Sequence, residues 1–251
     1  MSSPILATRN LGLDIGGARI VVDVSLEVAE GELLGIIGPN GAGKTSLFNL
    51  LSGLYRPTAG SIHLAGKDIT RQPTFLRTRE GIGRTFQVSS VFPLLTVHEN
   101  VRLAAEASIG GTLRLWQRAL SVKPAQERAR AAIARVGLEP KSLARAGALS
   151  HGDKRRLELA MLLAADKPVL LLDEPMAGVS AENVPELVEL IRSVHEQERK
   201  TVLMVEHHID VVTGIAQRIA VMHNGALLAC DTPAAVMANE TVQSAYLGEE
   251  L

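Results

Sequence analysis

The sequence predicts an α/β protein built on a mostly parallel β-sheet, and two features of the 251-residue chain lead to this prediction. Short apolar runs recur along the chain and alternate with segments of helical periodicity, the order that places helices between parallel strands. Apolar residues make up 46% of the chain and charged residues 21%, the balance of an ordinary globular protein. We therefore expect an α/β core with enough apolar side chains to fill it.

The expected elements follow one another along the chain. Alternating stretches in residues 5–28 indicate an antiparallel β layer at the N-terminus. The apolar run Leu33–Ile37 is typical of a buried strand, and Lys44–Ser52 is typical of a helix that ends at Gly53. Further strands are expected at residues 62–64, 169–172, 201–205 and 219–222.

The middle of the chain has a different pattern. From about residue 97 to 165 the periodicity is helical, with few strand signals. Gly110 and Gly111 interrupt this pattern, and we expect a new helix to begin at Pro124. The segment predicts a helical subdomain inserted into the α/β core.

Charge and cysteine content narrow the function classes. The net charge is −1, so no overall field would attract nucleic acid, and we expect no nucleic-acid partner. Cys230 is the only cysteine, which excludes an intrachain disulfide, and we expect it to be a small core residue. Residues 1–13 lack the pattern of a signal peptide, and no apolar run reaches the roughly 18 residues that span a bilayer. We expect a cytoplasmic chain that meets a membrane only through partners.

The first motif is Gly-Pro-Asn-Gly-Ala-Gly-Lys-Thr, which fits G-x-x-x-x-G-K-[ST] between an expected strand and an expected helix. Glycines let backbone N–H groups point at a phosphate, and the N-terminus of the helix favours the same anion. We expect Lys44 to reach the β- and γ-phosphates and the Thr45 hydroxyl to ligate Mg²⁺. The predicted nucleotide-binding residues are Gly38, Pro39, Asn40, Gly41, Ala42, Gly43, Lys44, Thr45 and Ser46.

The second motif is an apolar strand that ends in two acids, Asp173 and Glu174. Burying charge is costly unless the charge is used. Asp173 could belong to the Mg²⁺ shell, and Glu174 could polarise an attacking water. A strand ending in a solvated loop is the alternative, but a phosphate-binding loop in the same chain favours the functional interpretation.

The third motif is Leu-Ser-His-Gly-Asp at residues 149–153, followed by an apolar helix. Ser150 and Asp153 have the spacing of a helix-capping box, a purely structural alternative. Capping does not explain why Gly152 lies in the first helical turn. Gln87 and His207 complete the set, and they gain weight only from their order and spacing among the other motifs.

In this order the motifs resemble the ATP-binding domain of ABC transporters, a P-loop NTPase fold, over residues 5–251. The resemblance implies that Glu174 is the catalytic base, that His207 contacts the γ-phosphate, and that Lys44 and Gln87 also take part in catalysis. It implies Mg²⁺ ligands at Thr45, Gln87 and Asp173, and a dimer in which Ser150, His151 and Gly152 complete the ATP site of the opposite subunit.

Within that family, the stretches at residues 83–87, 149–153, 173–178, 205–207 and 245–248 are similar to ATP-binding subunits of branched-chain amino acid importers. This implies ATP hydrolysis that powers uptake of branched-chain or other hydrophobic amino acids. The implied partners are a second ATP-binding subunit, identical or a sibling, two integral membrane permease subunits and, indirectly, a solute-binding protein. The subunit would be peripheral on the inner face of the cell membrane. Transport of urea or short amides, lipopolysaccharide export and a soluble non-transport ABC ATPase remain alternatives.

The sequence departs from the family pattern in places. The usual signature is Leu-Ser-Gly-Gly-Gln, whereas this chain has His151 and Asp153 at two of those positions. Ser180 stands where the D-loop normally carries an aspartate. The aromatic residue that usually stacks on adenine aligns near Ile15, which cannot stack, so we expect the base to be read weakly.

Overall fold

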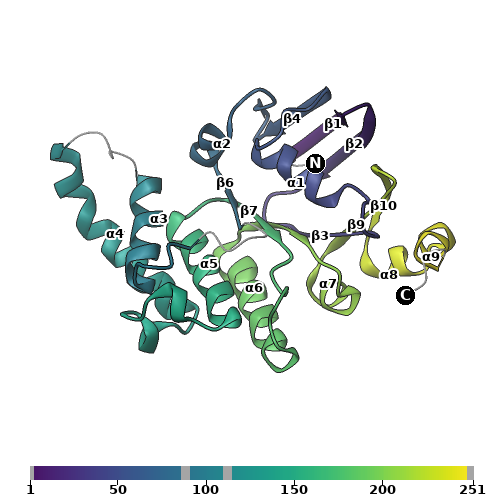
Figure 1. Ribbon diagram of the computed structural model, residues 1–251. Helices are drawn as coiled ribbons and strands as arrows, with labels where there is room; N and C mark the ends of the chain where they lie inside the picture. Colours follow the sequence, from purple (N-terminus) through teal and green to yellow (C-terminus); the bar gives the residue numbers. More distant parts are fainter. Residues whose placement is uncertain (1–2, 86–90, 110–114, 248–251) are drawn as a thin grey trace. The chain divides into compact units, whose positions relative to one another are not determined.

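The computed structural model describes residues 3–85, 91–109 and 115–247 (Figure 1). Its contacts divide the chain into two units. The first unit contains the described parts of Met1–Ile82, Val169–Glu174 and Arg192–Leu251, and the second contains those of Gly83–Pro168 and Pro175–Ile191. That residues 5–251 act as one nucleotide-binding domain stays a prediction.

A four-stranded antiparallel sheet forms the N-terminal part of the first unit, with strand order β2-β1-β4-β5. Alternation of buried and exposed side chains along β2 explains this sheet, since one face is buried and the other is not. Gly16 and Gly17 both have positive φ and join β1 to β2 in a two-residue hairpin turn. The predicted antiparallel layer is confirmed. Its strands are β1 (Leu6–Ile15), β2 (Ala18–Val28), β4 (Ala59–Leu64) and β5 (Lys67–Asp68).

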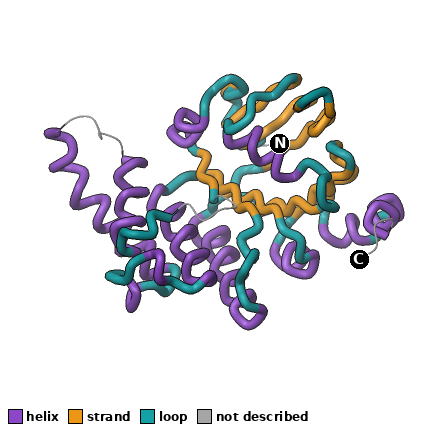
Figure 2. Tube along the Cα trace, viewed as in Figure 1, coloured by secondary structure: helices purple, strands orange, loops and turns teal. Residues whose placement is uncertain are grey.

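A six-stranded sheet has the order β10-β9-β3-β8-β7-β6 (Figure 2). Strand β3 is parallel to β8 and β9, β7 is parallel to β8, and β10 is antiparallel to β9. Every residue of β3, β7 and β8 is buried, as expected for strands of a covered parallel sheet. The predicted mostly parallel sheet is confirmed. Its strands are β3 (Leu33–Ile37), β6 (Ile82–Arg84), β7 (Val169–Asp173), β8 (Thr201–Val205), β9 (Arg218–His223) and β10 (Ala226–Asp231).

Helix α1 (Lys44–Ser52) joins the two sheets of the first unit in one apolar core. Leu47, Phe48, Leu50 and Leu51 of this helix are buried among side chains from both sheets. The core therefore fixes the helix whose first turn contains the last residues of the phosphate-binding motif. The shorter helices of this part of the chain are α2 (Thr74–Glu80), α7 (Ile209–Ile215), α8 (Pro233–Met237) and α9 (Glu240–Leu247).

Three helices, α3 (Val97–Ile109), α4 (Leu115–Arg135) and α5 (His151–Ala165), pack against one another in the second unit. The expectation that Pro124 begins a helix is wrong, because Pro124 lies inside α4. Proline removes one helical hydrogen bond but its fixed φ is helical, and the alanine- and arginine-rich sequence after it favours continuation of the helix. The second unit also contains the 3-10 turns η1 (Glu139–Lys141), η2 (Ala146–Ala148) and η3 (Ala181–Asn183). Helix α6 (Val184–Glu198) begins in the second unit and ends in the first.

Cys230 is only partly buried, whereas a core position was expected. It lies on β10 and its Sγ accepts a hydrogen bond from Arg218 Nη2 at 3.0 Å.

Within the described ranges, none of the helices combines the length and the apolar character needed to cross a bilayer.

Candidate nucleotide site

The predicted phosphate-binding loop connects the end of β3 to the start of α1. Gly38, Gly41 and Gly43 all have positive φ, at 152°, 80° and 95°. A Cβ at Gly38 would lie 2.2 Å from the carbonyl oxygen of Met222, and one at Gly43 would lie 2.8 Å from that of Ile20. Close backbone packing therefore requires glycine at these two positions, independently of any ligand.

The first turn of α1 is suited to hold an anion. Gly43 is the N-cap and has no side chain to satisfy the N–H groups of that turn, which have no acceptor within the helix. Hydrogen bonding along the helix begins with Leu47, whose N–H donates to Gly43 O at 2.8 Å. Backbone N–H groups and the positive end of the helix dipole thus meet where a phosphate would bind.

Lys44 places a buried cation in the same loop. The residue is 5% exposed, and its Nζ donates to Gly38 O at 2.6 Å and to Pro39 O at 2.9 Å. Burial lowers the pKa of Lys44, while the negative charges of Glu174 and Asp173 act in the opposite direction. The loop therefore carries one positive side chain within the field of two carboxylates, an arrangement that a bound polyphosphate would complete.

Strand β7 ends at Asp173, and the next residue, Glu174, turns away from the strand. Glu174 has φ of 48°, a left-handed conformation that non-glycine residues rarely adopt. Its backbone N–H donates to Val205 O at 2.9 Å, which holds this turn against the end of β8. Its Oε1 lies 2.9 Å from His207 Nε2, so two residues singled out from separate motifs form a pair.

His207 is itself fixed by its neighbour Glu206. The His207 backbone N–H donates to Glu206 Oε2 at 2.9 Å, and Glu206 is 2% exposed. The His207 ring is 42% exposed and the Glu174 side chain 19%. The pair can therefore be reached by a nucleotide and by water, and a carboxylate beside an imidazole can accept a proton from that water.

A hydroxyl and a carboxylate that suit Mg²⁺ are also present in the first unit. Asp173 is fully buried at the end of β7, and Thr45 lies in the first turn of α1, a helix that contacts β7. Mg²⁺ commonly binds one or two protein oxygens and completes its shell with phosphate and water. These residues fit such an ion. Gln87, the third predicted ligand, lies outside the described residues.

The β9–β10 turn supports the phosphate loop, a role that the sequence did not predict. Gly225 N donates to Ala42 O at 3.1 Å, and Gly225 O accepts from Val22 N at 2.8 Å. Asn224 and Gly225 have φ of 47° and 80°, as in a two-residue hairpin turn of the Asn-Gly type. The Asn-Gly pair is a local turn signal, but its contact with Ala42 depends on the tertiary fold.

We expect Gly225→Ala to destabilise the protein by about 1–3 kcal/mol more than Gly66→Ala does. Both glycines have nearly the same φ, 80° and 79°. A Cβ at Gly225 would lie 2.7 Å from Ile20 O, whereas one at Gly66 would have no atom within 4 Å among the described residues. Urea unfolding of the two variants measures the difference. Equal free energies of unfolding would contradict close packing of the turn at Gly225.

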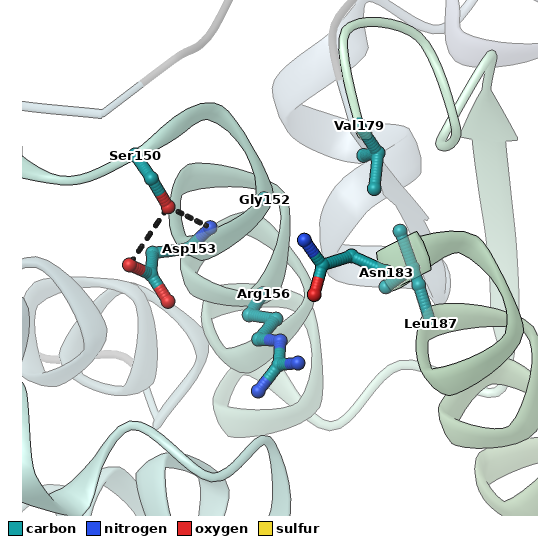
Figure 3. A pocket seen from close by; sticks show the side chains of 7 residues that line it. All are labelled: Ser150, Gly152, Asp153, Arg156, Val179, Asn183 and Leu187. Carbon is teal, nitrogen blue, oxygen red and sulfur yellow. Dashed lines mark hydrogen bonds between the residues drawn. The ribbon is translucent and has the colours of Figure 1, made fainter. Parts of the chain in front are cut away.

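The second unit contains the Leu-Ser-His-Gly-Asp motif at the start of α5 (Figure 3). The capping interpretation is confirmed, since Ser150 is the N-cap and its Oγ accepts from Asp153 N at 3.2 Å. Apart from its chain neighbours and the backbone of its own helix, a Cβ at Gly152 would have no atom of the described chain within 4 Å. Nothing described in this subunit thus explains the glycine, which suits a position that a group from outside approaches closely.

A small pocket of about 50 Å³ opens beside this motif, entirely within the second unit (Figure 3). Its polar side comes from the start of α5, and the residues after β7 supply the opposite side. Ser180, the D-loop departure, is the N-cap of η3 there and accepts from Asn183 Nδ2 at 2.6 Å. The pocket is lined by Ser150, Gly152, Asp153, Arg156, Val179, Asn183 and Leu187.

The predicted site residues therefore fall into two groups. Lys44, Asp173, Glu174 and His207 belong to the first unit with the rest of the phosphate loop, and residues 150–152 belong to the second. His151 lies beside Gly178, whose added Cβ would come within 3.7 Å of His151 Nδ1.

Ile15, the residue predicted to face the base, ends β1 and is 49% exposed. A side chain there can make apolar contact but cannot stack as an aromatic ring does. Base–aromatic stacking is worth about 1–3 kcal/mol in nucleic-acid sites. We therefore expect GTP to compete with ATP within about tenfold, or roughly 1.4 kcal/mol. Ile15→Tyr should tighten nucleotide binding, and a preference for ATP above about a hundredfold in competition assays would contradict this expectation.

Comparison with known proteins gives concordant family matches. The family model described as "ABC transporter" matches residues 21–177. The model described as "Branched-chain amino acid ATP-binding cassette transporter" matches residues 226–251.

Three curated relatives match over at least 98% of their length. The high-affinity branched-chain amino acid transport ATP-binding protein LivG of Salmonella typhimurium is 39% identical over 99% of this chain and 100% of its own. BraF of Pseudomonas aeruginosa, described in the same words, is 37% identical with the same coverage. The lipopolysaccharide export system ATP-binding protein LptB of Escherichia coli is 35% identical over 98% of each chain.

Solved structures agree with the fold. The ADP conformation of an ATP-binding cassette of an ABC transporter has a TM-score of 0.84 and 26% identity, covering 99% of this chain and 100% of that one. With the phosphate loop, the paired Glu174 and His207 and the capped helix α5 in place, these matches agree with the site geometry. The chain belongs to the ABC transporter ATP-binding family, as a subunit that binds and hydrolyses ATP.

Proposed function

We propose that this chain hydrolyses ATP to power uptake of branched-chain or other hydrophobic amino acids through two separate membrane permease subunits. The observation that carries the substrate class is the match of residues 226–251 to the branched-chain family model, because this segment lies outside the ATPase match. The full-length relatives at 37–39% identity support the same class.

The chemistry we propose starts from the phosphate loop. The N–H groups of the first turn of α1 and the Lys44 ammonium bind the β- and γ-phosphates. Glu174 accepts the proton of a water that attacks the γ-phosphorus, and the bond to the β-phosphate oxygen breaks to give ADP and phosphate. His207, 2.9 Å from Glu174, orients that carboxylate and contacts the γ-phosphate. Mg²⁺, held by Thr45 and Asp173 with Gln87, would neutralise phosphate charge.

We further propose that two ATP-binding subunits, identical or siblings, enclose the nucleotides between them. Ser150 and Gly152 then cap the γ-phosphate held by the opposite subunit. The open space around Gly152 supports this, because a substituent there would obstruct an approaching phosphate without disturbing its own subunit. His151, between Ser150 and Gly152, lies in the first turn of α5, whose N–H groups point at the same anion.

Activity should therefore depend on a second subunit. We expect the specific ATPase activity of the isolated chain to rise with protein concentration, or to be present only when the partner subunits are added. Steady-state hydrolysis over a wide dilution range is the measurement, with oligomeric state followed in parallel. A dilute monomer with full, concentration-independent activity would contradict a shared site.

The permease contact is proposed to lie near Gln87, Val88 and Phe92. The first two lie outside the described residues, while Phe92 is 54% exposed and Leu94 is 79% exposed. Exposed apolar side chains of this size are suited to a cytoplasmic helix of a membrane partner. The subunit would thus be peripheral on the inner face of the cell membrane, and a solute-binding protein would act on it only through the permease.

Transport in cells tests the substrate class. Cells that lack the chain should lose uptake of labelled leucine and regain it with the wild-type chain but not with Glu174→Gln. Labelled urea and a short amide serve as the comparison substrates. Unchanged leucine uptake, with urea or amide uptake lost instead, would overturn the amino-acid assignment. Intact uptake of all of them together with a defect in lipopolysaccharide export would favour the LptB-like role.

A further inference from the structure

One oxygen of Asp153 gathers a small charged network at the start of α5. Asp153 Oδ2 accepts from Lys141 Nζ at 2.5 Å and from Ser150 Oγ at 2.8 Å. Asp153 N also donates to Ser150 Oγ at 3.2 Å, so the serine and the aspartate are joined by two hydrogen bonds. All three residues belong to the second unit.

The network is anchored on its lysine side as well. Lys141 ends η1, its N–H donates to Leu138 O at 3.0 Å, and its carbonyl accepts from Ala144 N at 2.9 Å. The Asp153 side chain is 14% exposed and that of Lys141 is 51% exposed. Burial raises the pKa of Asp153, but the hydrogen bonds from Lys141 and Ser150, together with the positive charges of Lys141 and Arg156, act in the opposite direction and leave that pKa below its usual range. The surroundings thus favour the ionised carboxylate, and Lys141 is the cation that is hydrogen-bonded to it.

We propose that Lys141 is a positioning residue of the ATP site, which holds Asp153 and Ser150 in place and cancels the carboxylate charge on the face presented to the partner's nucleotide. This inference rests on the proposed function, in which Ser150 and Gly152 cap a γ-phosphate. Asp153 lies at the third position of α5, where a negative charge stabilises the helix start but repels a polyphosphate. With Lys141 beside it, Asp153 can still stabilise the start of the helix, while its repulsion of the polyphosphate is reduced.

The proton of the Ser150 hydroxyl gives Lys141 a second role. A serine hydroxyl has one proton, and here Oγ donates it to Asp153 Oδ2. To donate to a γ-phosphate the hydroxyl must turn away from that carboxylate. Once the hydroxyl has rotated, Asp153 Oδ2 still accepts a hydrogen bond from Lys141, so the carboxylate is not left without a donor.

A purely structural role makes a different prediction. If the pair only supported the fold, Lys141→Met would lower the thermal midpoint and leave the KM for ATP unchanged, because the Asp153 carboxylate, 14% exposed, would lose its ammonium partner. A role toward nucleotide should instead raise the KM for ATP, since the uncompensated carboxylate would face the phosphates. Removing that carboxylate should make the lysine dispensable, because Asp153→Gln leaves no charge to cancel.

The test uses the affinity-tagged chain purified with its native partner subunits. Lys141→Met should raise the KM for ATP by about three- to tenfold and change kcat by less than about twofold. The rise in KM should become smaller as the KCl concentration is raised, because salt screens the repulsion between carboxylate and phosphate. Lys141→Arg should keep the wild-type KM, and Lys141→Met combined with Asp153→Gln should restore it. The matched control is Lys67→Met, which breaks the exposed Lys67–Glu80 pair of the first unit and should leave KM unchanged.

Two results would overturn the inference: an unchanged KM in Lys141→Met, or a double variant no better than Lys141→Met alone. Glu174→Gln in the same complex separates this failure from failure of the proposed function. Loss of hydrolysis in Glu174→Gln with an unchanged KM in Lys141→Met would reject the role of Lys141 alone. Hydrolysis that survives Glu174→Gln would reject the proposed catalytic base, while the KM comparison still decides the role of Lys141.

Discussion

Replacing Glu174 by glutamine is expected to lower ATP turnover by about 10²–10⁴-fold while ATP binding is retained. Glutamine has nearly the same shape but cannot accept the proton of an attacking water. The backbone hydrogen bond from residue 174 to Val205 O does not involve the side chain, so the turn after β7 should persist. Steady-state hydrolysis and calorimetric ATP binding, both on the chain with its partner subunits, measure the two effects separately.

Asp210→Asn is the matched control for this substitution. Asp210 is an exposed carboxylate on α7 in the first unit, so the variant also removes one negative charge of that unit. We expect its turnover to equal that of the wild type. Turnover in Glu174→Gln within about tenfold of the wild type would show that another group accepts the proton. The 2.9 Å contact makes His207 the first residue to examine in that case.

Much of the α/β core could be predicted because its central strands are buried on both faces. The continuous apolar runs at Leu33–Ile37 and Thr201–Val205 leave only one consistent interpretation, and both strands have these bounds in the structure. Strands β6 and β10 were not predicted. The first has three residues and the second is only partly buried along most of its length, so neither produces a clear pattern. Strand order depends on pairing between distant segments, which periodicity does not encode.

Some residues of the candidate site could likewise be predicted from the sequence, and others could not. The phosphate loop and the acidic end of β7 could be predicted because their chemistry lies in consecutive residues. The pairing of Glu174 with His207 could only be inferred from the resemblance, since these residues are 33 positions apart. Lys141 and Gly225 were missed because each acts through a tertiary contact, with Asp153 and with Ala42 respectively. The Asn-Gly pair marks a turn at Gly225, but nothing in the sequence marks the partner of either residue.

Replacing Lys44 by methionine should weaken ATP binding itself, by roughly thirtyfold or more. Methionine keeps an unbranched apolar stem but loses the ammonium that donates to Gly38 O and Pro39 O. The substitution also removes the positive charge that interacts favourably with the carboxylates of Glu174 and Asp173. Truncating one partner of a buried, hydrogen-bonded charge pair costs about 2–5 kcal/mol, and about 1.4 kcal/mol corresponds to tenfold in affinity. Calorimetric titration with ATP measures the loss.

Lys167→Met provides a stringent comparison, because Lys167 is also a buried lysine. The two lysines are 7% and 5% exposed, and burial lowers the pKa of both. Lys167 precedes β7 in the second unit and faces the charges of Asp166 and Arg128 instead of the phosphate loop. A general effect of removing a buried charge should appear in both variants, as a change in the urea midpoint. A loss of ATP affinity confined to Lys44→Met would place the interaction at the phosphates, whereas an equal loss in both, or an affinity within about threefold of the wild type in Lys44→Met, would contradict it.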